Sequence, residues 1–254
     1  MKNLFNSCLI AFSMYSKIPM PKSDWKKENM TYVMCFFPFV GCVIGGIVWL
    51  SFLLLAKSNM GQPFQTVVLL LLPVALTGGI HLDGFLDTID ALSSFQSKER
   101  KLEIMKDPHM GAFAVIGAIA YFFMAYGIWA DVTIETIGVI ACSFVLSRIL
   151  SGLSVVCFPM AKESGLASSF ANAAQKKTTR IVLVIYLLIL CVTMLLYQPF
   201  FSAIVFATAS IVYGYYFYTS KKNFGGITGD LAGYFLQLCE LLVTIAVVIA
   251  SKIS

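Results

Sequence analysis

Three aspartates and a histidine lie within ten residues of one another, directly after a long uncharged run. If one helix carries them, Asp83, Asp87 and Asp90 occupy positions i, i+4 and i+7 and share a face. Like charges at this spacing repel one another and destabilise an isolated helix. A divalent cation turns that repulsion into binding, because Mg²⁺ takes carboxylate oxygens together with substrate phosphates. The segment therefore predicts a Mg²⁺ site for a phosphate-bearing substrate, with His81 beside it.

The same acids also admit a structural interpretation, in which they solvate the end of a helix or pair with Lys98 and Arg100. Their place at the end of an apolar run favours the functional interpretation, because ionisable residues at membrane depth are costly and usually functional. We therefore expect Asp83 and Asp87 to take part in catalysis as well as in metal binding.

A second polar segment follows at residues 102–111. Its Asp107-Pro108 pair predicts a turn, and Gly111 opens a helix whose backbone N–H groups can receive an anion. Lys106 and His109 would add positive charge or transfer a proton, which makes them candidate catalytic residues. An ordinary basic loop would have the same composition.

A glycine-rich segment precedes the last apolar run. Gly225, Gly226 and Gly229 permit close backbone approach and positive φ angles, and Thr228 lies among them. We expect these four residues to bind substrate. Asp230 is either the N-cap of the following helix or a fourth ligand of the metal.

Two charged residues, Arg148 and Glu240, fall inside apolar runs. A glutamate at that depth requires a partner, and Arg148 is one candidate. Alternatively, the arginine side chain extends to the membrane surface. We assign Arg148 to substrate binding, together with Lys162 of the small polar segment 161–170, although a plain connector would resemble that segment.

The composition is that of an integral membrane protein. Of 254 residues, 59% are hydrophobic and only 12% are charged, against about 25% charged residues in soluble domains. The seven cysteines include no C-x-x-C pair, which gives no support for a zinc site or a disulfide framework. The lysines are not interleaved with exposed aromatic residues, so no nucleic-acid partner is expected. No nucleotide-binding glycine motif of the ATPase or dinucleotide type is present.

The hydropathy pattern predicts an all-α, polytopic fold with about seven transmembrane helices in a single membrane domain, residues 1–254. A spanning helix needs about 20 mostly apolar residues. The N-terminal run, residues 3–16, is too polar for that and is expected to be an interfacial helix. The expected spans are 31–55, 62–81, 111–130, 133–157, 181–197, 200–219 and 231–251.

Positive residues gather before the first expected span and after the second, fourth and sixth. Lysine and arginine are enriched in cytoplasmic loops. We therefore expect a cell-membrane protein with its N-terminus inside. The polar loops expected at about residues 82–110, 158–180 and 220–230 would then face the cytoplasm together and carry the active site.

Several segments, in this order, resemble the motifs of the cobalamin synthase family, the adenosylcobinamide-GDP ribazoletransferases. The resemblance covers nearly the whole chain. Its departures are Ala91 and Ala167 in place of glycines, and Ser16-Lys17 where many members have Thr-Arg. These changes leave the expected metal ligands intact. The matching segments are Ile18–Pro21, Phe37–Gly41, Gly78–Asp90, Glu103–Phe113, Lys162–Leu166 and Gly225–Gly233.

The resemblance implies a Mg²⁺-dependent membrane enzyme that joins adenosylcobinamide-GDP to α-ribazole, or to α-ribazole 5'-phosphate, and releases GMP. Metal ligands would be Asp83, Asp87, Asp90 and Asp230. Either His81 or one of the aspartates would accept the proton of the attacking hydroxyl. Lipid is the expected surrounding, and a homo-oligomer is compatible with the sequence.

Two other functions compete with this interpretation. A CDP-alcohol phosphotransferase also carries acids at a membrane boundary, but its pattern has Ala-Arg where this chain has Asp87-Thr88. A secondary transporter uses intramembrane acids for ion coupling, yet such proteins often show internal repeats. No repeat is visible here, and the acids cluster at one boundary.

Overall fold

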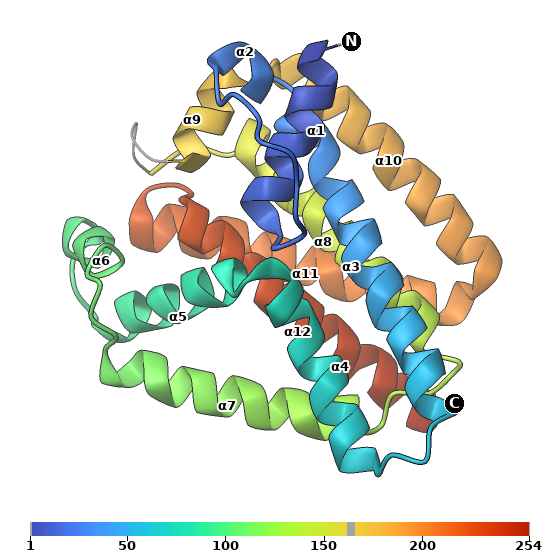
Figure 1. The fold of residues 1–254 in the computed structure, drawn as a ribbon. Coiled ribbons are helices and arrows are strands. Elements are labelled where there is room, and N and C mark those ends of the chain that lie inside the picture. Colours follow the sequence, from blue (N-terminus) through green and yellow to red (C-terminus); the bar gives the residue numbers. More distant parts are fainter. Residues whose placement is uncertain (1, 162–165, 254) are drawn as a thin grey trace.

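The computed structural model describes residues 2–161 and 166–253, and within these residues the chain forms twelve helices and no β-strand (Figure 1). This agrees with the expected all-α fold. The helices are α1 (Lys2–Tyr15), α2 (Lys27–Met30), α3 (Val33–Ala56), α4 (Gln62–Thr77), α5 (Ile80–Ser93), α6 (Lys98–Ile104), α7 (Ala112–Trp129), α8 (Ile137–Cys157), α9 (Leu166–Ala173), α10 (Lys176–Tyr197), α11 (Pro199–Phe224) and α12 (Gly229–Ile253).

Within the described residues, six helices are long and apolar enough to cross a membrane: α3, α7, α8, α10, α11 and α12. The bent pair α4–α5 makes a seventh if the two are counted as one span. Most of α8 and α12 is buried inside the bundle, whereas α7 and α10 expose most of their apolar surface. The protein is therefore polytopic, with α8 and α12 at its centre.

Contacts near the helix ends show that the connections form two groups at opposite ends of the bundle. At the end that holds the C-terminus, Gln62 Nε2 donates to Ala130 O at 2.7 Å, and Lys252 Nζ lies 3.3 Å from Asp131 Oδ1. The α3–α4 connection and the C-terminus accordingly lie together in Figure 1, away from α6 and α9.

The polar segments of the sequence meet at the other end. Lys101 Nζ of α6 donates to Asn223 Oδ1 of α11 at 2.9 Å. The segment after α8 joins the glycine-rich segment through an isolated parallel bridge between Met160 and Ile227. An active site built from residues of several polar segments can therefore form at this end.

One expected element is wrong: residues 62–81 are not a single helix. Helix α4 ends at Thr77, and Gly78 and Gly79 both adopt left-handed φ angles, of 65° and 77°. Helix α5 then leaves at 94° to α4. The Lys17 side chain packs against Gly78, since a Cβ there would lie 2.1 Å from Lys17 Cε unless the lysine moved. The bend turns α5, and its aspartates, across the end of the bundle.

The three segments expected as loops are largely helical. Segment 82–110 contains most of α5 and all of α6, and segment 158–180 contains α9. In segment 220–230, α11 continues to Phe224 and α12 already begins at Gly229. The remaining spans end within a few residues of their expected bounds, and the expected N-terminal helix is present as α1.

Candidate active site

The site depends on a close crossing of α5 and α12. A Cβ added at Gly84 of α5 would lie 2.7 Å from Asp230 Cα, and one added at Gly233 of α12 would lie 2.9 Å from His81 O. Real Cβ atoms do not approach other atoms this closely, so both positions require glycine. The two backbones are therefore in contact, and the aspartates of α5 lie beside the start of α12.

The crossing brings four carboxylates together. Asp83, Asp87 and Asp90 lie on one continuous helix, as the spacing predicted. Asp87 is close enough to Asp83, Asp90 and Asp230 to be repelled by all three. Such a group is unstable unless protons or cations compensate its charge.

The donor set fits a hard cation, since all four groups supply carboxylate oxygens. In the part of the chain that the structure describes, however, no three histidine, cysteine, aspartate or glutamate side chains already converge on one point suitable for a metal. Asp83 is exposed, and Asp87 and Asp230 are only partly buried. A Mg²⁺ ion shared by these carboxylates would need them to converge further than they do in this structure.

A cavity of about 280 Å³ opens beside these carboxylates. Six of the residues predicted to do chemistry or bind substrate line it: His81, Asp83, Lys106, Thr228, Gly229 and Asp230. They come from α5, the segment after α6, and the start of α12. The remaining wall is mostly apolar, and it includes Met14, Tyr15, Met34, Phe37, Met105 and Met160.

Thr228 has a structural role at the start of α12. Its Oγ1 accepts a hydrogen bond from Leu231 N–H at 3.1 Å, which is the contact made by a helix-capping residue. The alternative that Asp230 is the N-cap is therefore wrong. As the second residue of α12, Asp230 lies where the helix dipole favours a negative charge.

Gly225 and Gly226 shape the loop and do not line the cavity. Gly225 ends α11 with a φ of 80°. Beside Gly226, Ile227 N–H donates to Pro159 O at 2.9 Å, and Ala161 N–H donates to Ile227 O at 2.9 Å. The predicted substrate-binding residue Lys162 follows directly and lies outside the described residues.

Asp90 and His109 are close in the sequence to residues that line the cavity, but neither of them lines it. A Cβ at Gly111 would lie 2.1 Å from Asp90 Oδ2, so this carboxylate already occupies the start of α7, where an anion was expected. His109 is exposed, and its Nδ1 is 2.7 Å from Asp107 Oδ1. Hydrogen bonds from the His109 backbone and ring hold the pKa of Asp107 below its usual range.

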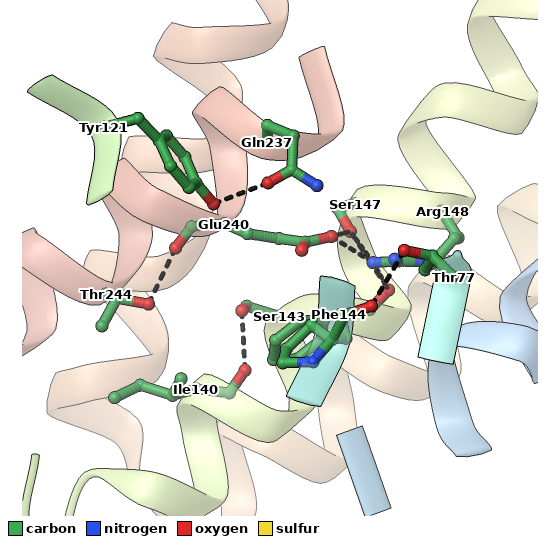
Figure 2. A network of polar contacts seen from close by, with 11 residues as sticks. Thr77, Tyr121, Ile140, Ser143, Phe144, Ser147, Arg148, Gln237, Glu240 and Thr244 are labelled. Carbon is green, nitrogen blue, oxygen red and sulfur yellow. Dashed lines mark hydrogen bonds and ion pairs between the residues drawn. The ribbon is translucent and has the colours of Figure 1, made fainter. Parts of the chain in front are cut away.

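Arg148 is buried deep in the bundle and does not reach the surface (Figure 2). Its Nη1 pairs with Glu240 Oε1 and also donates to Phe144 O at 3.1 Å. Ser147 Oγ lies 2.9 Å from the same Glu240 oxygen. Of the two alternatives from the sequence, the buried ion pair is confirmed and extension to the surface is wrong. Arg148 does not line the cavity.

Sequence reasoning missed the aromatic side of the site. The Tyr15 ring lies nearly parallel to His81, with centroids 6.0 Å apart, and packs against Phe37 at 4.3 Å. Phe37 and Met105 stand inside segments that resemble family motifs, which was the only available indication. Tyr15 is the last residue of α1, and no spacing in the sequence relates it to α5.

Comparison with known proteins gives one consistent family. The model of the family described as cobalamin-5-phosphate synthase matches residues 7–248. A protein of Lachnoclostridium phytofermentans named adenosylcobinamide-GDP ribazoletransferase is 47% identical over 98% of this chain and 95% of its own length. Proteins of the same name from Clostridium perfringens and Desulfitobacterium hafniense are each 34% identical, over 94% and 92% of this chain and 96% and 92% of their own lengths. No solved structure was found to match.

Proposed function

The chain belongs to the cobalamin-5-phosphate synthase family, and we propose that it is the adenosylcobinamide-GDP ribazoletransferase of cobalamin biosynthesis, dependent on Mg²⁺. The observation that carries this proposal is the match in family and in name over nearly the full chain. In the reaction, a hydroxyl of α-ribazole, or of its 5'-phosphate, attacks the phosphorus nearest cobinamide. The bond from that phosphorus to the GMP phosphate breaks, and GMP leaves.

The chain's own groups suit this displacement. Asp83, Asp87 and Asp230 would hold Mg²⁺, with Asp90 as a further candidate. The metal would supply charge stabilisation on the transferred phosphoryl group and the leaving phosphate. Lys106 lies on the same cavity wall and adds positive charge for the pyrophosphate. Either His81 or one aspartate accepts the proton of the attacking hydroxyl.

The test is a reaction of purified protein with adenosylcobinamide-GDP and α-ribazole, followed by measurement of GMP. We expect GMP in amounts equal to the corrinoid product, and loss of both when EDTA removes divalent cations. Readdition of Mg²⁺ should restore the rate. Release of CMP from a CDP-activated alcohol, with no GMP from the corrinoid, would contradict the proposal.

We also propose that the cavity end faces the cytoplasm at the cell membrane, because lysine and arginine gather in the segments at that end. Cysteines introduced at the exposed positions Gln96 and Lys222 should resist a membrane-impermeant thiol reagent in intact cells. A cysteine at exposed Asn59, at the other end, should react. The unsubstituted chain, with its seven cysteines, gives the background. Efficient labelling at Gln96 and Lys222 in intact cells would reverse the orientation.

A further inference from the structure

The cavity beside the aspartates combines an apolar wall with a buried polar atom that has no partner. His81 is only 3% exposed, and it is one of the residues that line the cavity. Among the residues that the structure describes, its Nε2 has no hydrogen-bond partner. Buried polar atoms are nearly always hydrogen-bonded, and leaving one without a partner costs free energy. A ligand that reaches this atom from the cavity would supply the missing partner.

The size of the cavity limits what that ligand can be. Sites that bury drug-sized ligands begin at about 300 Å³, and this cavity measures about 280 Å³. It has room for one flat two-ring group. A corrin macrocycle with its amide side chains is several times larger and cannot enter, so the corrinoid must approach from outside the cavity.

Three flat bases take part in the proposed reaction: the adenine and the guanine of adenosylcobinamide-GDP, and the base of α-ribazole. The cavity wall distinguishes the last from the first two. Adenine and guanine carry donors and acceptors along several edges, and those that enter the apolar part of the cavity would face Tyr15, Phe37 and the surrounding methionines without partners. The base of α-ribazole is a benzimidazole, which is apolar apart from one ring nitrogen that is not bonded to ribose. An apolar base with one acceptor matches the apolar part of the wall, where the buried His81 Nε2 has no partner.

We propose that this cavity binds the base of α-ribazole, and that His81 Nε2–H donates a hydrogen bond to the free ring nitrogen. The inference rests on the proposed function and makes it more specific. With the base in the apolar part, the ribose points towards Asp83 and Asp230 on the polar wall. His81 is thereby assigned to substrate binding, which leaves acceptance of the hydroxyl proton to an aspartate.

The first test changes the ligand and leaves the protein intact. An α-ribazole analogue with an indole base replaces the free ring nitrogen by C–H. Purified wild-type protein should show a KM for this analogue about tenfold higher than for α-ribazole, the size expected for one buried hydrogen bond. Equal KM values would overturn the assignment of His81.

Variants of His81 then identify the donor. His81→Gln keeps an N–H at a similar reach and should preserve the preference for α-ribazole. His81→Leu should accept α-ribazole and the indole analogue with equal KM, and its KM for adenosylcobinamide-GDP should stay unchanged. If the KM of His81→Leu for the indole analogue is still tenfold higher than for α-ribazole, another group must donate the hydrogen bond to the ring nitrogen.

The second test fills the cavity. Met105 is buried on its wall, so Met105→Trp should raise the KM for α-ribazole at least tenfold and leave the KM for adenosylcobinamide-GDP unchanged. The matched control is Ile116→Trp on the exposed apolar surface of α7, which should alter neither value. If only the KM for adenosylcobinamide-GDP rises, the cavity belongs to the other substrate and the inference is wrong, while the transferase function stands. Absence of GMP with wild-type protein would instead overturn the proposed function.

Discussion

Replacing either Asp83 or Asp87 with asparagine should lower the rate of GMP release by more than about 100-fold at saturating Mg²⁺, since changing even an outer-shell partner of a metal typically costs 10–100-fold. Asparagine keeps the shape of the side chain but removes the negative charge that a hard cation requires. The four carboxylates at the crossing of α5 and α12 repel one another when no cation is bound. Removing one charge should therefore leave the thermal stability of the metal-free protein unchanged or slightly higher.

Measuring GMP release and thermal stability together distinguishes a metal site from a structural one. If the aspartate were needed for folding, its substitution would lower both the stability and the activity of the protein. If the aspartate is a metal ligand, the substitution should lower the activity alone. Asp131→Asn is a matched control, because Asp131 lies at the other end of the bundle, beside Lys252. Its GMP release should stay within about twofold of wild type, as for surface changes away from special features. Rates near wild type for both Asp83→Asn and Asp87→Asn would refute the metal site.

Asp90→Asn should have a smaller effect than the other two substitutions. Its carboxylate lies against Gly111 at the start of α7, where it interacts favourably with the helix dipole. The position on the same face of α5 was visible in the sequence, but this competing contact was not. A helix pattern gives the face on which a side chain lies, and only the tertiary structure gives the neighbour that it meets there.

The bend at Gly78-Gly79 illustrates what hydropathy does not contain. The apolar run continues to Ile80 without a charge, so the pattern predicted one helix over 62–81. The left-handed φ angles of the two glycines end α4 and direct α5 across the end of the bundle. Apolar character indicates burial or contact with lipid, and it does not indicate where a helix changes direction.

The cavity wall was the least predictable part of the site. Tyr15, Met34 and Met105 come from three separate helices or their ends, and each would suit any apolar core. The polar wall was predictable because charged residues in an apolar chain are conspicuous and costly. The sequence thus identified where the chemistry is expected, and it contained nothing about the shape of the space next to it.

The ion pair between Arg148 and Glu240 leads to the second large expected effect (Figure 2). It joins α8 to α12, the two most buried of the long helices. Glu240→Ala should lower the free energy of unfolding by about 3–5 kcal/mol, since it leaves the arginine charge buried without its partner. The measurement is thermal or denaturant unfolding of the purified protein in one detergent. A loss below about 1 kcal/mol, the range of exposed pairs, would contradict a buried pair.

The double variant Arg148→Met, Glu240→Met tests whether the ion pair serves stability alone or also substrate binding. Replacing both members of a buried ion pair with apolar residues of similar volume is often neutral or stabilising, so this variant should unfold near the wild-type temperature. Arg148 is absent from the cavity wall and its Nη1 is engaged by Glu240, Ser147 and Phe144. The double variant should therefore keep GMP release and both KM values close to wild type. A stable double variant with a raised KM for adenosylcobinamide-GDP would instead assign the arginine to substrate binding, because stability would be restored and recognition would not.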